Sequence, residues 1–233
     1  FGSSMKEFVS DAIDICCLPG KGRGLVAKRP VQLGELLFVS RAFQIAPVKS
    51  IADSIVQALR RATPAERRAF TSLYDGSSGN CVPIGWFLPD AHAAPDGVVE
   101  EPLLKNAEHV ARVVRLNAHS VASLMADSIF DGAECQGEAD PTECGLWFLP
   151  SMVNHDCMPS AVCVPVNRHT LAFVAACQLD PGDEITDTYV NLLQCLRDRQ
   201  QELSEQKGFR CKCGRCSVEA AALPDSVAGA VLH

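Results

Sequence analysis

Long apolar runs are missing from this 233-residue chain. Its most apolar stretch, residues 145–153, is far shorter than the ~20 residues that a membrane-spanning helix needs, and Pro150 interrupts it. Residues 1–5 are interpreted as a vector-derived remnant that ends at a start methionine, and no secretory or transit signal follows. The sequence therefore predicts a protein of the cytoplasm or the nucleus with no membrane partner.

Two nucleotide-binding signatures are also absent. The glycine-rich turn Gly22-Arg23-Gly24 has neither the G-x-G-x-x-G form of a dinucleotide site nor the G-x-x-x-x-G-K-[ST] form of a P-loop. The regular strand–helix alternation of a Rossmann domain is missing as well. Glycines at this turn would nevertheless let the backbone approach a ligand closely.

Basic side chains are absent from residues 116–167, although the whole chain carries 21 Lys and Arg against 28 Asp and Glu. The acidic residues of this stretch are Asp127, Asp131, Glu134, Glu138, Asp140, Glu143 and Asp156. They form either a solvated loop or an acidic surface that attracts a basic protein substrate. Because such a surface repels phosphates, nucleic acid is not expected as a direct ligand of this face.

Cysteine, in contrast, is abundant, with 12 residues. Without a signal peptide, a disulfide framework is disfavoured, and the nine scattered cysteines are interpreted mostly as small buried apolar residues. The other three, Cys211, Cys213 and Cys216, form a C-x-C-x-x-C motif. Three thiolates at this spacing can share one Zn²⁺ with a fourth ligand. Spacing alone does not choose that ligand among the remaining cysteines and histidines.

The composition, 47% hydrophobic and 21% charged, is typical of a folded domain. Short strands are predicted at 25–28 and 36–39, and a hairpin at 161–166 and 170–176. Helical periodicity occurs in the segments 51–59, 65–74, 102–130 (with a break near Asn117) and 192–206. The pattern predicts a mainly β protein with a helical insertion, hence the α+β class.

A second motif, Asn154-His155-Asp156-Cys157-Met158-Pro159, is ambiguous by itself. His155 beside Asp156 could be part of a catalytic triad or a structural histidine, and no nucleophile elbow supports a triad. Cys157 could be a core residue, a nucleophile or a metal ligand.

Taken in order along the chain, these motifs resemble the SET-domain protein lysine methyltransferases, and among them the SMYD-like branch. The resemblance extends over residues 18–218. Its motifs are Gly22-Arg23-Gly24-Leu25, Gly34-Glu35-Leu36-Leu37-Phe38, the segment 154–159, Pro181-Gly182-Asp183-Glu184-Ile185, Tyr189 and C-x-C-x-x-C. It implies a SET-domain β-clip with a knot-like core, a helical SET insert and a C-terminal zinc-binding post-SET segment. The SMYD-type MYND zinc finger is expected to be absent, because Cys81 is the only cysteine between Ile45 and Asn117.

The resemblance also implies a division of the chain into segments. The N-terminal part of the SET domain is expected at 18–50, the helical insertion at 51–131 and the C-terminal SET core at 132–191. The post-SET helix and zinc site follow at 192–220, and the tail at 221–233.

The same resemblance implies S-adenosylmethionine as cofactor and one structural zinc ion. Tyr189 matches the catalytic tyrosine that faces the transferred methyl group, and Cys157 the fourth zinc ligand beside Cys211, Cys213 and Cys216. The residues implied in cofactor binding are Lys21, Gly22, Arg23, Asn117, Asn154, His155, Tyr189 and Phe209. The implied substrate is a protein with an accessible lysine, expected in a basic segment.

This chemistry suits the residue types. Methyl transfer runs in line from a sulfonium to the lysine ε-nitrogen, so alignment supplies much of the rate. The lysine must arrive neutral although its free pKa is about 10.4, and a dry channel beside a cation disfavours the ammonium form.

Three positions depart from the family pattern. Asp156 replaces a serine and Ser160 an asparagine, both polar changes of modest expected effect. Lys207 stands where relatives often carry a second tyrosine, which could widen the channel or weaken activity unless another ring, such as Trp147, takes over. A catalytically weak or inactive SET-fold scaffold, acting as an interaction module, is therefore the alternative. A purely structural zinc protein would explain only the C-terminal cysteines.

Overall fold

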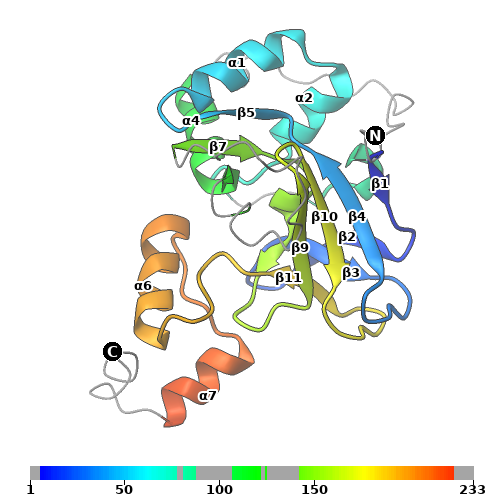
Figure 1. Ribbon diagram of the computed structural model, residues 1–233, viewed down its shortest axis with the longest axis vertical. Helices are drawn as coiled ribbons and strands as arrows, with labels where there is room; N and C mark the ends of the chain where they lie inside the picture. Colours follow the sequence, from blue (N-terminus) through cyan, green and yellow to red (C-terminus); the bar gives the residue numbers. More distant parts are fainter. Residues whose placement is uncertain (1–5, 78–80, 88–106, 122–123, 125–141, 223–233) are drawn as a thin grey trace.

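The computed structural model describes residues 6–77, 81–87, 107–121, 124 and 142–222. Within these residues, short strands form three sheets, and helices lie at both ends of the long axis (Figure 1). The strands are β1 (Phe8–Val9), β2 (Ile13–Leu18), β3 (Gly22–Ala27), β4 (Leu36–Arg41), β5 (Gln44–Pro47), β6 (His119–Ser120), β7 (Glu143–Leu146), β8 (Asn154–His155), β9 (Ala161–Asn167), β10 (Thr170–Ala175) and β11 (Glu184–Asp187). The helices are α1 (Ile51–Arg61), α2 (Pro64–Thr71), α4 (Ala107–Asn117), α6 (Leu196–Lys207) and α7 (Gly214–Ala222), with 3₁₀ turns η1 (Ile84–Phe87) and η3 (Pro150–Met152).

The three sheets have the strand orders β1-β4-β10-β9, β2-β3-β11-β8 and β5-β7-β6. The predicted hairpin is confirmed as β9 and β10, which pair antiparallel. In the second sheet β3 pairs antiparallel with β11, whereas β8 runs parallel to β11. This sheet thus carries the glycine-rich turn, the segment around His155 and the strand that leads to Tyr189.

A single apolar core joins the sheets to the helices α1, α2 and α4. Phe38 of β4 stacks on Phe173 of β10, with ring centroids 4.5 Å apart. Trp147 is fully buried, and its indole N–H donates to the carbonyl of His169 at 3.1 Å. Because the buried ring is also hydrogen-bonded, the turn after β7 is held firmly against the hairpin.

The helices follow the signals in the sequence. Helix α1 buries Ile51, Ile55 and Leu59 on one face, and α2 begins with a capping box between Thr63 and Glu66. Helix α4 ends at Asn117, where the break in the predicted 102–130 helix was expected, and β6 follows it. The predicted α+β class is therefore confirmed. No helix of the described segments is long and apolar enough to cross a membrane.

Helices α6 and α7 lie at the opposite end of the molecule from α1 and α2 (Figure 1). Apolar residues of these two helices and of the segments packed against them form a second, smaller cluster separate from the main core. Its buried members are Cys157, Val190, Leu203, Cys211 and Cys216.

The prediction that the scattered cysteines are mostly buried is wrong for the part of the chain described. Only Cys144 and Cys157 are buried among the scattered free cysteines, while Cys177 is exposed. Cys16 and Cys163 are half-buried because they lie on the edge strands β2 and β9, where alternate side chains point away from the core.

The structure also pairs Cys17 with Cys81 as a disulfide, with Cα atoms 5.6 Å apart. This bond was not expected. The fold brings the end of β2 beside the segment before η1, although 64 residues separate the two cysteines. Spacing in the sequence cannot reveal such a contact.

The acidic residues predicted between Asp127 and Asp140 lie outside the described residues, as do residues 1–5 and most of the predicted tail.

Candidate active site and metal site

The parallel pairing of β8 with β11 brings two distant motifs together. Asn154 lies opposite Thr186 and His155 opposite Asp187, and the Asp156 N–H donates to the Asp187 carbonyl at 2.9 Å. The other edge of β11 pairs with β3, which begins in the glycine-rich turn. Three motifs that are far apart in the sequence therefore meet in one sheet.

Asn154 connects the three strands through its side chain. Its amide donates to the Arg23 carbonyl at 2.8 Å and to the Glu184 carboxylate at 3.0 Å. Glu184 also forms an ion pair with Lys21. The amide passes directly over Gly24, where a Cβ atom would lie 2.6 Å from Asn154 Nδ2 and 2.6 Å from Leu18 Cδ1. The glycine is therefore needed for close approach.

Gly24→Ala is expected to destabilise the protein by about 1–3 kcal/mol, because the added methyl group must displace Asn154 or Leu18 in a packed sheet. Thermal denaturation measures this loss. Gly85→Ala is the matched control, because an added Cβ at Gly85 meets nothing within 4 Å. Equal melting temperatures for the two variants would contradict the close approach.

His155 and Tyr189 are fixed to each other. The Tyr189 backbone N–H donates to His155 Nδ1 at 3.0 Å, so the ring proton of the imidazole belongs on Nε2. Nε2 lies 3.3 Å from the Cys157 sulfur. Burial lowers the pKa of His155 to about 4, which keeps the ring neutral near pH 7. The imidazole therefore bridges Tyr189 and Cys157 through fixed hydrogen bonds.

The Tyr189 phenol is also held in place. Its O–H donates to the Val153 carbonyl at 2.6 Å, and its ring lies 5.3 Å from the His155 ring. Burial raises the pKa of Tyr189 well above its usual value. The hydroxyl thus stays protonated at neutral pH, so it can orient a partner but cannot act as a base.

Arg23 is the buried cation of the glycine-rich turn. It is 8% exposed, and its Nε donates to the Met152 sulfur at 2.9 Å. Its Nη2 has no hydrogen-bond partner among the described residues. A buried guanidinium nitrogen without a partner is costly, so this position suits an anionic ligand such as a carboxylate.

Asn117 and Phe209, two further predicted cofactor residues, differ in their surroundings. The Asn117 amide donates to the carbonyls of Tyr74 at 2.6 Å and Val113 at 2.7 Å, so both of its hydrogens are engaged within the protein. Phe209 is 38% exposed, and its ring centroid lies 6.1 Å from that of His155. Phe209 is thus beside the β8–β11 site, whereas the Asn117 side chain serves the end of α4.

The four predicted zinc ligands come together. The sulfur atoms of Cys157, Cys211, Cys213 and Cys216 all lie within 4.8 Å of one another. Cys157 Sγ lies 3.5 Å from Cys216 Sγ and 4.0 Å from Cys211 Sγ. A tetrahedral ion with bonds of about 2.3 Å requires sulfurs about 3.8 Å apart. Burial raises the pKa of Cys157 to about 11, so the thiolate form requires a nearby cation. This donor set fits Zn²⁺.

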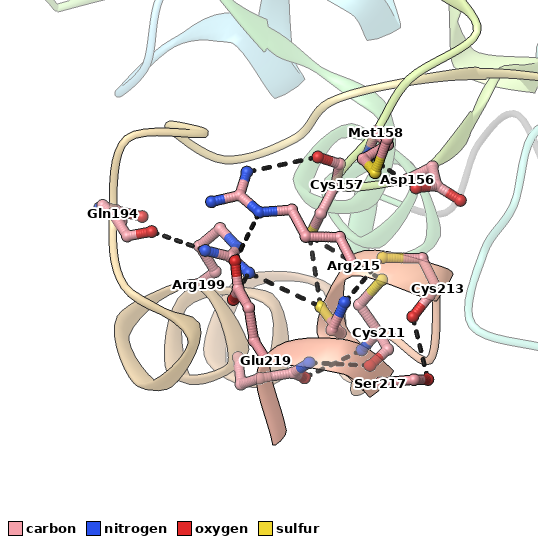
Figure 2. Close-up of polar contacts among 12 residues, drawn as sticks. Asp156, Cys157, Met158, Gln194, Arg199, Cys211, Cys213, Arg215, Ser217 and Glu219 are labelled. Atoms are coloured by element: carbon pink, nitrogen blue, oxygen red, sulfur yellow. Dashed lines mark hydrogen bonds and ion pairs between the residues drawn. The ribbon is translucent and has the colours of Figure 1, made fainter. Parts of the chain in front are cut away.

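A buried arginine supports the cysteines from α6 (Figure 2). Arg199 is fully buried, donates to the Gln194 carbonyl at 2.6 Å and the Glu219 carboxylate at 2.5 Å, and approaches Cys216 Sγ at 3.9 Å. Arg215 donates to the same carboxylate at 2.7 Å. A zinc ion held by four thiolates would leave two negative charges at the site, and these guanidinium groups, which share the one carboxylate of Glu219, would offset part of them.

Arg199 was missed in the sequence, although it left a signal. It lies between Leu196 and Leu203 on the face of α6 that packs inward, where a charged residue is out of place. Such a position indicates a buried ionic partner, which here is Glu219.

Arg199→Met is expected to weaken zinc binding by about 10–100-fold, because the thiolates lose their compensating charge and Glu219 loses a partner. Competition with a chromogenic chelator measures the affinity. Arg197→Met on the exposed face of the same helix is the control. If both variants bind zinc as tightly as the parent chain, Arg199 has no role in the metal site.

The comparisons with known proteins agree with these motifs. The SET domain family matches residues 22–190, more than half of the chain. The histone-lysine N-methyltransferase set5 of Schizosaccharomyces pombe is 26% identical over 222 residues, which cover 92% of this chain and 53% of that protein. A SET and MYND domain-containing protein of Dictyostelium discoideum is 40% identical over 72 residues, 31% of this chain and 21% of that protein.

Histone-lysine N-methyltransferase SMYD3 of Homo sapiens is 31% identical over 85 residues, 36% of this chain and 20% of that protein. Among solved structures, the SET domain of LSMT bound to MeLysine and AdoHcy is 10% identical with a TM-score of 0.44, over 89% of this chain and 54% of that one. The chain spans about half the length of the fission-yeast relative and less of the other two. The predicted family is confirmed: this chain belongs to the SET domain family.

Proposed function

We propose that this protein transfers a methyl group from S-adenosylmethionine to the ε-amine of a lysine in a protein substrate. The observation that carries the proposal is the meeting of Asn154, His155 and Tyr189 beside the glycine-rich turn, through the β3–β11–β8 pairing. Two of the relatives described above are named as histone-lysine N-methyltransferases, which agrees with this chemistry.

The residues present fit the cofactor. Arg23 offers a buried Nη2 without a partner among the described residues, suited to the carboxylate of the methionine part, with Lys21 and Gly22 beside it in the same turn. Asn154 and His155 would hold the adenosyl part, and Phe209 would cover it. Asn117 is proposed to contribute through its side-chain oxygen, because its amide hydrogens already bond the carbonyls of Tyr74 and Val113. When bound, S-adenosylmethionine supplies an electrophilic methyl group on a sulfonium.

Tyr189 is the proposed catalytic residue. Its hydroxyl donates to Val153 and stays protonated, so its oxygen lone pairs remain available to orient the amine of a substrate lysine. Because the protonated phenol cannot act as a base, the substrate amine must lose its proton to solvent before the transfer. Alignment and dryness of the site, rather than proton abstraction, then supply the rate.

The proposed zinc ion is structural. It would tie Cys157, next to β8, to the three cysteines that follow Phe209. Metal binding would therefore fix Phe209 against the His155 ring and complete the wall of the site.

The proposed substrate is a protein with an accessible lysine in a basic segment, and histones are the first candidates because of the names of the relatives. A cytoplasmic or nuclear location follows from such a substrate. Five of the acidic residues that would attract it, from Asp127 to Asp140, lie outside the described residues, and Glu143 is paired with Arg168. A SET-fold scaffold remains the second candidate function, because Lys207 stands near Tyr189 in place of a tyrosine.

Calorimetric titration with S-adenosylmethionine, followed by incubation with core histones and radiolabelled cofactor, tests the proposal. We expect one molecule of S-adenosylmethionine to bind per chain and the radiolabel to appear on a histone. A mixed protein extract is added in a parallel reaction, where label on another protein would equally support the proposal. Binding without any transfer would favour the scaffold. Absence of binding would refute the proposed function.

A further inference from the structure

Lys207 is the last residue of α6, and its side chain enters the candidate active site. The helix ends here because Gly208 adopts a left-handed conformation with φ of 77°. The Lys207 Nζ lies 5.2 Å from the centroid of the Tyr189 ring. It donates a hydrogen bond to the Leu116 carbonyl at 3.1 Å. The amine is therefore held between the ring of the proposed catalytic tyrosine and a backbone carbonyl.

The surroundings of this amine contain little negative charge. Among the described residues, no carboxylate lies within ion-pair distance of Lys207, and burial lowers the pKa of its amine. His119 lies close by: burial, and to a lesser degree the charge of Lys207, lower the pKa of this histidine to about 4. Its Nε2 has no hydrogen-bond partner in the described segments. Burial thus shifts the Lys207 amine towards its neutral, nucleophilic form.

An acceptor lysine in the proposed reaction needs the same surroundings: an aromatic wall, a carbonyl that orients the nitrogen and no strong counter-ion. Lys207 has all three, and its own chain supplies them. The Leu116 carbonyl is one of the last of α4, where helix carbonyls lack partners inside the helix. That carbonyl is therefore free to hold an amine.

We propose that Lys207 is a methyl acceptor of its own chain, methylated in cis at the Tyr189 site. The inference rests on the proposed function. The Nζ lone pair forms a bond to the methyl carbon of S-adenosylmethionine, and the carbon–sulfur bond breaks with its electron pair on sulfur. S-adenosylhomocysteine leaves, and the methylated ammonium releases a proton to water. A modified Lys207 would remain beside Tyr189, in the path of an external substrate.

The test is intact-mass and peptide mass spectrometry of the full chain, as isolated and after incubation with S-adenosylmethionine. We expect the peptide that contains Lys207 to gain one or more methyl groups, at a rate independent of protein concentration. Lys207→Arg, which keeps the charge, should lose the modification and retain cofactor binding in calorimetry. Lys212→Arg, at an exposed position between Cys211 and Cys213, should still be methylated at Lys207. Tyr189→Phe should carry none, even as isolated.

The outcomes separate this inference from the proposed function. Methylation of an added protein with Lys207 unmodified in all samples overturns the inference alone, and Lys207 then only caps α4. A rate that rises with protein concentration shows transfer between molecules and overturns transfer in cis. Failure to bind S-adenosylmethionine overturns both proposals.

Discussion

Tyr189→Phe is expected to lower methyl transfer to a protein substrate by at least about 100-fold, while the affinity for S-adenosylmethionine changes by less than about threefold. The substitution removes one hydroxyl that is fixed on the Val153 carbonyl and leaves the ring beside His155 in place. The orienting oxygen is therefore lost without a large change in packing. Single-turnover kinetics with radiolabelled cofactor measure the transfer step, and calorimetry measures cofactor binding.

Tyr74→Phe is the matched control, because Tyr74 is the other tyrosine of the chain and is 45% exposed. It removes the same hydroxyl from the surface and should leave the transfer rate unchanged. Turnover by Tyr189→Phe at the parent rate would refute the catalytic assignment. A parallel loss of cofactor binding would instead assign Tyr189 to the binding of the cofactor.

Cys213→Ser is expected to lower the zinc content from about one ion per chain to none, with at least about 100-fold weaker binding. Three sulfurs would remain around the site, and the serine hydroxyl does not ionise as readily as a thiol. Elemental analysis after dialysis measures the metal content. Differential scanning calorimetry should record a lower transition temperature for the part of the chain that contains α6 and α7.

Cys177→Ser serves as the control for this variant, since Cys177 is exposed and outside the cluster. It should keep both the metal and the melting behaviour of the parent chain. If Cys213→Ser still retains one zinc per chain, the four-cysteine ligand set is wrong.

The family and the main elements could be predicted because their signals are local. The β9–β10 hairpin has strands separated by a short polar turn, and the C-x-C-x-x-C motif carries its own spacing. Cys157 could be assigned to the zinc site only through the resemblance, because 54 residues separate it from Cys211. The structure brings these residues together through the pairing of β8 with β11.

Other features depend on contacts that no sequence pattern encodes. The pairing of Cys17 with Cys81 joins two ordinary-looking cysteines across the fold. The Asn117 amide donates to the carbonyls of Val113 and Tyr74. These bonds depend on how α4 ends and on the segment that packs beside it, so the sequence alone does not predict them. At Lys207 the sequence predicted a wider channel or weaker activity, because an aromatic ring is missing there. The structure instead places the long Lys207 side chain against the Tyr189 ring. In each case the outcome depends on the direction of one side chain in three dimensions.

The second apolar cluster, which includes residues of α6 and α7, affects how the molecule unfolds. Its buried members are largely the proposed metal ligands, and it is separate from the core that supports the sheets. We therefore expect the chain to unfold as two cooperative units rather than one, with the C-terminal unit dependent on the proposed zinc ion more than on its own hydrophobic contacts. When the proposed zinc ion is scarce, we expect a folded β scaffold in which the wall beside Tyr189 is incomplete. Metal availability would then set the fraction of molecules that can carry out the proposed reaction.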